Sequence, residues 1–126
     1  MKLRINGNSL RLRITRSELD ALIFNGRIEE TTWLGSGADC RLTYALELSD
    51  GDDVTLRCVP PEIAVLVPSG EAAKWRNGDQ VGIYATAELG PCGSLELVIE
   101  KDFACLDRSD EDDIDTFPNP LAGAVC

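Results

Sequence analysis

Residues 2–25 read KLRINGNSLRLRITRSELDALIFN, and the elements that this stretch predicts decide the fold. Apolar and polar residues alternate on both sides of Asn6-Gly7-Asn8, which is typical of two half-buried strands joined by a tight hairpin turn. Thr15 and Glu18 then have the spacing of a capping box, in which each side chain binds a backbone amide at the start of a helix. Gly26 suits the left-handed end of that helix. The stretch therefore predicts a strand, a second strand and a helix.

The same order of elements returns about 53 residues further along the chain. Leu19 and Leu22, on the apolar side of the first helix, correspond to Ala72 and Trp75 of a second helix expected at about residues 70–76. Two strands follow each helix, and two strands precede the second one. These six further strands are expected at residues 27–34, 41–48, 54–59, 62–67, 80–89 and 94–101.

Eight strands and two short helices predict an α+β fold dominated by β structure. We expect a duplicated ββαββ unit, with repeat halves at residues 2–48 and 54–101, inside a single pseudo-symmetric domain of residues 1–106. Neither half alone would bury enough surface to be stable. The sheet should be mostly antiparallel and strongly curved or closed into a barrel, because closure removes exposed strand edges.

The composition limits the function classes. A chain of 126 residues with 44% hydrophobic content has the size and apolar content of one domain. Its net charge of −10 argues against general nucleic-acid binding and against binding to anionic membranes, since both need a basic surface. No stretch reaches the ~20 apolar residues of a membrane span, and no signal region follows the start. A cytoplasmic location is therefore expected.

The chain has no histidine, which removes the commonest general base, the commonest transition-metal ligand and every imidazole-dependent triad. The five cysteines contain no Cys-x-x-Cys pair, so we expect reduced and mostly buried thiols. Neither a catalytic residue nor a cofactor or metal site is assigned. The cysteines are Cys40, Cys58, Cys92, Cys105 and Cys126.

Positive charge is concentrated in the first hairpin. Five of the 12 basic residues lie there or just beyond it, namely Lys2, Arg4, Arg11, Arg13 and Arg16. Arginines on one strand face can grip phosphate or carboxylate groups bidentately. The alternation of apolar and polar residues does not fix the direction in which this basic strand face points, so two interpretations are open. In the first, the face points inward and lines a tunnel for a polyanion. In the second, it is a solvated outer face on which the aliphatic parts of the arginine side chains cover apolar surface.

The composition changes after residue 106. Residues 107–126 form an acidic tail, and its first part, residues 107–115, holds six of the 22 acidic residues. We expect this acidic part either to dock on the basic hairpin or to act as a solubilising segment. Asp110, Asp112 and Asp113 are candidate calcium ligands, but they lack the fixed spacing and the glycine of an EF-hand loop.

Phe117, Pro118 and Pro120 form a candidate docking segment with an aromatic anchor. Proline restricts the unbound chain and so lowers the cost of ordering it. The segment binds either a partner or its own domain. Cys105 would lie on the same side of an extended strand as Lys101, although a buried structural thiol is the simpler interpretation. Cys126 could form a disulfide on oxidation.

Several stretches resemble a family of small, uncharacterised bacterial proteins. They are Asn6-Gly7-Asn8-Ser9-Leu10-Arg11-Leu12-Arg13, Leu42-Thr43-Tyr44-Ala45-Leu46-Glu47, Glu100-Lys101-Asp102-Phe103-Ala104-Cys105-Leu106, Asp115-Thr116-Phe117-Pro118-Asn119-Pro120 and the cysteine close to the C-terminus. The resemblance covers most of the chain. It implies a bacterial, intracellular, stand-alone domain of unknown function.

Two functions remain after these exclusions, beside a purely structural role in assembly. The first is a non-enzymatic binding module whose partner is a protein or a small anionic ligand. The alternative is an enzyme that processes phosphate esters or polyphosphates inside a barrel, with inward carboxylates that hold a divalent metal. The candidate carboxylates are Glu29, Glu47, Glu96 and Glu100.

Overall fold

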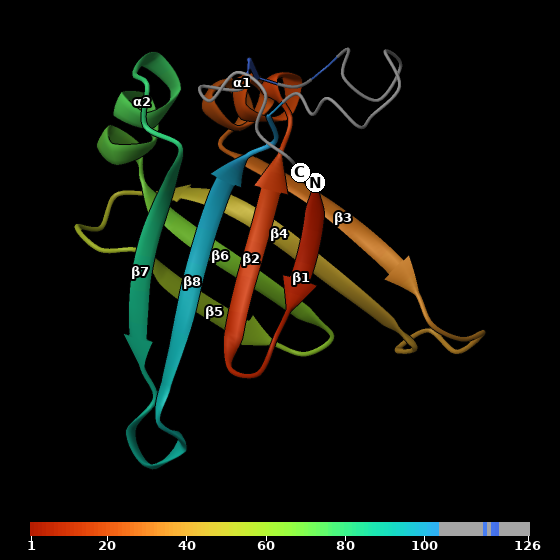
Figure 1. Cartoon of the computed structure of the whole chain (residues 1–126). Coiled ribbons are helices and arrows are strands. Elements are labelled where there is room, and N and C mark those ends of the chain that lie inside the picture. The colour runs from red at the N-terminus through yellow and green to blue at the C-terminus, as the bar shows by residue number, and fades with distance from the viewer. Residues whose placement is uncertain (104–114, 116, 119–126) are drawn as a thin grey trace.

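The computed structural model describes residues 1–103, 115, 117 and 118, and in it two four-stranded sheets lie face to face with both helices at one end (Figure 1). Sheet A has the strand order β1-β2-β8-β7, and sheet B has the order β3-β4-β6-β5. The strands of sheet A are β1 (Lys2–Ile5), β2 (Ser9–Ile14), β7 (Gly82–Glu88) and β8 (Ser94–Lys101). Those of sheet B are β3 (Arg27–Trp33), β4 (Arg41–Ser49), β5 (Thr55–Val59) and β6 (Glu62–Pro68). The helices are α1 (Arg16–Asn25) and α2 (Ser69–Asn77), and a short 3-10 turn, η1 (Gly90–Cys92), joins β7 to β8.

Local signals in the sequence place the first helix correctly. The capping box forms, because the Thr15 amide donates to Glu18 Oε1 at 2.9 Å and the Glu18 amide donates to Thr15 Oγ1 at 3.3 Å. Gly26 ends α1 with a φ of 83°, a left-handed conformation that glycine adopts without steric cost. Neither described helix is long and apolar enough to cross a membrane.

The order ββαββ occurs twice, and each sheet takes one hairpin from each half of the chain. The centre of each sheet is a parallel pair that joins the halves, β2 with β8 and β4 with β6. The prediction that the strands close into a barrel is wrong, because the described strands form two sheets instead of one closed sheet. The reason lies in the helices, since α1 carries the chain from sheet A to sheet B and α2 carries it back.

The core lies between the sheets and beneath the helices. Leu12 and Leu97 of sheet A and Leu46 and Val65 of sheet B belong to one buried cluster, which Trp75 of α2 completes. These side chains occupy the place where a tunnel would run. The interior of the described structure is therefore a packed apolar core of the ordinary kind.

Three cysteines lie outside this core, so the expectation of mostly buried thiols is wrong for them. Cys40 is exposed in the loop between β3 and β4, Cys58 is exposed on the edge strand β5, and Cys92 is exposed in η1. Loops and edges leave side chains in solvent whatever their hydrophobicity. Cys105 and Cys126 lie outside the described residues.

Candidate functional site

The basic residues of the first hairpin lie on the outer face of sheet A. Leu10, Leu12 and Ile14 of β2 are buried in the core, so Arg11 and Arg13 between them point away from it. The register of the β1–β2 hairpin places Lys2 opposite Arg13 and Arg4 opposite Arg11. We call this group of four side chains the basic face. Its outward orientation favours the solvated interpretation over a tunnel lining.

One of the two cross-strand pairs is balanced by carboxylates. Lys2 Nζ lies 3.6 Å from Asp102 Oδ2, and Arg13 Nη2 lies 3.8 Å from Glu100 Oε2. Glu100 also lies 4.0 Å from Arg11 Nε. The carboxylates of β8 and the residue after it therefore neutralise one end of the basic face.

The other pair has less compensation. Arg4 and Arg11 line a notch of about 100 Å³ together with Asn6 and Ser9. In the described part of the chain, the Arg4 guanidinium has no ion pair and no hydrogen bond, and Arg11 has only the contact with Glu100. Two like charges directly opposite each other on a sheet destabilise it unless something lies between them. An anion would fit that position.

Arg16, the fifth predicted residue, does not belong to the basic face. It lies in the first turn of α1, and its guanidinium lies 5.7 Å from the centre of the Phe117 ring. The structure therefore brings together Lys2, Arg4, Arg11 and Arg13 on one face of the hairpin, whereas Arg16 lies on α1.

Phe117 lies against the end of β8. Its amide donates to the Asp102 carbonyl oxygen at 2.9 Å, its ring centre lies 6.0 Å from that of Phe103, and Lys101 Nζ lies 5.1 Å from its ring. Pro118 is exposed, while Pro120 lies outside the described residues. Two of the stretches that carry the family resemblance, residues 100–106 and 115–120, thus meet at their described residues.

Asp115 contacts the start of α1 instead of the basic face. Its Oδ1 accepts from the Ser17 amide at 3.1 Å, its Oδ2 accepts from the Ser17 hydroxyl, and its carbonyl accepts from the Arg16 amide at 3.2 Å. The hydrogen bonds from Ser17, led by that from its side chain, lower the pKa of Asp115 despite partial burial. Residues 107–114, including Asp110, Asp112 and Asp113, lie outside the described residues.

The burial of Lys101 was not predicted from the sequence. Its Nζ donates to the Gly78 carbonyl oxygen at 3.0 Å, and burial lowers its pKa. The signal was present, because Lys101 continues the inward alternation of Leu97 and Ile99 along β8. Its surroundings, the Gly78 carbonyl and the Phe117 ring, indicate a structural role at the end of the sheet.

The four candidate carboxylates do not converge on a metal site. Glu96 and Glu100 lie on the outer face of sheet A, and Glu29 and Glu47 lie on that of sheet B. Glu47 accepts hydrogen bonds from Arg27 and Arg57, Glu96 accepts from Thr86, and Glu29 and Glu100 are paired with arginines. Among the described residues, no group of three acidic or cysteine side chains is arranged to hold a metal ion.

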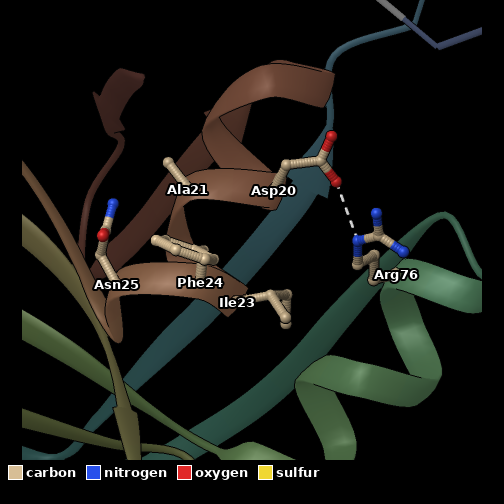
Figure 2. A pocket seen from close by; sticks show the side chains of 6 residues that line it. All are labelled: Asp20, Ala21, Ile23, Phe24, Asn25 and Arg76. Atoms are coloured by element: carbon tan, nitrogen blue, oxygen red, sulfur yellow. Dashed lines mark hydrogen bonds and ion pairs between the residues drawn. The ribbon is translucent and has the colours of Figure 1, made fainter.

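A separate cleft of about 720 Å³ lies between the two helices, and Figure 2 shows the six residues that line it. Arg76 of α2 donates to Asp20 of α1 at 2.8 Å across the cleft, while Phe24 of α1 is 89% exposed. Because the two charges neutralise each other, the cleft offers no unbalanced charge to an anionic ligand. The basic face is therefore the stronger candidate site.

Fold and site together define a two-sheet α+β protein with a packed interior and an outward basic face. A family model matches residues 1–121, and the chain belongs to that family, the family of unknown function DUF7009. No curated protein and no solved structure matches the chain.

Proposed function

We propose that this protein is a non-enzymatic binding module that recognises an anionic group through the basic face, Lys2, Arg4, Arg11 and Arg13. The observation that carries the proposal is the cross-strand pair of Arg4 and Arg11, which has little compensating charge in a chain of net charge −10. A bound anion would relieve the repulsion of this pair and gain charge-assisted hydrogen bonds. The partner is a small anionic ligand or an anionic group on a protein.

The alternative, a phosphate-ester or polyphosphate enzyme with an anion-binding interior, lacks the geometry that it needs. Such an enzyme requires inward cations and inward carboxylates around a channel. In the described part of the chain, apolar side chains fill the interior, and both sets of charged residues face outward.

The test is thermal unfolding of the reduced protein with and without tripolyphosphate at matched ionic strength. A ligand at 100 times its Kd adds about 2.7 kcal/mol to the free energy of unfolding, which raises Tm by about 5–15 °C for a domain of this size. The variant R4Q/R11Q should lose this rise. The variant R41Q/K74Q is the matched control, because it removes two positive charges elsewhere on the surface and should keep the rise.

Equal Tm shifts in the wild type and R4Q/R11Q would contradict the proposal, since binding would then not depend on the basic face. The same holds for a wild type whose Tm does not change with tripolyphosphate. The unliganded Tm of each variant shows whether the substitutions alter the fold itself.

A further inference from the structure

We infer that the notch lined by Arg4, Asn6, Ser9 and Arg11 binds a single phosphate group, either inorganic phosphate or the terminal phosphate of a phosphomonoester. The inference rests on the proposed function and names the ligand chemistry of its site. It concerns only this half of the basic face, because the Lys2–Arg13 half is already balanced by Asp102 and Glu100.

Hydrogen-bond donors line the notch on several sides. Two guanidinium groups, one carboxamide and one hydroxyl line the notch, and a guanidinium alone carries five N–H donors. Within the described residues, the side chains of Arg4, Asn6 and Ser9 have no hydrogen-bonding partner, and Glu100 is 4.0 Å from Arg11. The notch is therefore rich in donors, which is the complement of an oxyanion. The carboxylate opposite Ser9 on β8, that of Glu96, accepts from the Thr86 hydroxyl on the neighbouring strand β7.

Backbone hydrogen bonds hold the turn beside the notch in place. The Asn6 amide donates to the Ser9 carbonyl oxygen at 3.1 Å, and Gly7 between them has a φ of 57°, which closes the turn. Asn8 in the same turn is tied to β8, because its side chain donates to the Ser94 carbonyl and its carbonyl accepts from the Glu96 amide at 3.1 Å. A turn fixed in this way adds no cost of ordering the backbone on binding, and only the side chains that line the notch lose conformational freedom.

The notch is small, with a volume of about 100 Å³. It is open to solvent and suits one compact oxyanion group, so the rest of a larger phosphomonoester would lie outside it. A phosphate offers at least three acceptor oxygens that can meet donors on several sides, whereas a carboxylate offers two in one plane. Donors on two strands and on the turn between them therefore favour phosphate over carboxylate.

The experiment is isothermal titration calorimetry of the full chain with three probes at matched ionic strength: inorganic phosphate, phenyl phosphate and acetate. We expect inorganic phosphate or phenyl phosphate to bind at least tenfold more tightly than acetate. Tighter binding of phenyl phosphate would identify a phosphomonoester as the better ligand, and the reverse would identify free phosphate. R4Q/R11Q should lose at least a factor of ten in phosphate affinity, while N6A and S9A should each lose a factor of about three to ten. R41Q/K74Q should bind as the wild type does.

The outcomes separate this inference from the proposed function. Two outcomes would overturn the notch as a phosphate site and leave the basic face as a polyanion site. In the first, the protein binds tripolyphosphate but neither phosphate nor phenyl phosphate. In the second, N6A and S9A both bind phosphate with unchanged affinity. Phosphate binding that persists in R4Q/R11Q would overturn the inference as well. If no anion binds, both proposals are wrong. Far-UV circular dichroism and the unliganded Tm confirm that N6A, S9A and R4Q/R11Q are folded.

Discussion

Glu47 joins two arginines on the outer face of sheet B. Its Oε1 lies 2.8 Å from Arg27 Nη1 and its Oε2 lies 2.9 Å from Arg57 Nη1, and the two arginines come from the opposite edge strands β3 and β5. Beneath this network, Ala45 and Ala64 are buried although they are on the outer face of the sheet. The long charged side chains therefore act as a cover over the small residues at the centre of the sheet.

We predict that E47Q lowers the free energy of unfolding by about 1 kcal/mol at neutral pH, because a neutral amide binds two guanidinium groups more weakly than a carboxylate does. Urea denaturation at pH 7 measures this change. E29Q is the control: Glu29 is half exposed and lies 3.4 Å from Arg27, so its loss should have a smaller effect. A larger effect of E29Q than of E47Q would contradict the central role of Glu47.

The same residue predicts a pH dependence. Arg57, followed by Arg27, lowers the pKa of Glu47 below its usual value of 4.5. A carboxyl group whose pKa is lowered by folding contributes stability above its unfolded pKa, and this stability is lost as the pH falls through the folded pKa. The difference in unfolding free energy between the wild type and E47Q should therefore shrink as the pH is lowered from about 6 to about 3. A difference that is constant over this range would show that the ion pairs of Glu47 do not stabilise the fold.

At the scale of elements, Phe117 attaches its own segment, which lies outside the two sheets in the sequence, to the end of β8. Its amide and its ring both contact residues 101–103, and Asp115 caps the start of α1. We predict that F117A lowers the free energy of unfolding by about 1–2 kcal/mol, which is the value for a half-buried aromatic ring. Urea denaturation gives the change, and P118A, at an exposed neighbouring position, should lie within about 0.5 kcal/mol of the wild type. Equal stability of F117A and the wild type would show that these contacts add nothing to the fold.

The elements themselves were predictable from the sequence because their signals are local. The capping box of Thr15 and Glu18 fixes the start of α1, Gly26 fixes its end, and β8 was predicted with its observed bounds, Ser94–Lys101. The division into two sheets was not predicted. The pairing of β2 with β8 joins residues more than 80 positions apart, and strand periodicity does not identify the partner strand.

The candidate site was predictable in part for the same reason. Alternation showed that Lys2, Arg4, Arg11 and Arg13 share one face of the hairpin, because that relation depends only on neighbouring residues. It could not show that this face points outward, since that depends on which sheet covers the leucines of β2. Asn6 and Ser9 occupy polar positions of the same alternation, but they were missed as binding residues because their side chains carry no charge. The structure shows them lining one notch with Arg4 and Arg11.

At the scale of the whole molecule, each half of the chain contributes one hairpin to each sheet. Residues 1–49 supply β1–β2 to sheet A and β3–β4 to sheet B, and the rest of the chain supplies β7–β8 and β5–β6. The parallel pairs at the sheet centres exist only when both halves are present. A half on its own would hold two separate hairpins and one helix, and isolated hairpins are marginally stable at best in water.

We therefore predict that the chain divided in the exposed turn after Gly51 gives two fragments, residues 1–51 and 52–126, that are each unfolded and that fold together when mixed. Far-UV circular dichroism of each fragment, of the equimolar mixture and of the intact chain measures this. Trp75 provides a second signal, because it is fully buried in the core that both halves share and its fluorescence should shift to the blue on mixing. A cooperative unfolding transition of either fragment alone would contradict the prediction, since a half would then contain a complete core. Trp33 is 64% exposed in the intact chain, so it should contribute little to the blue shift on mixing, and the shift reports on Trp75.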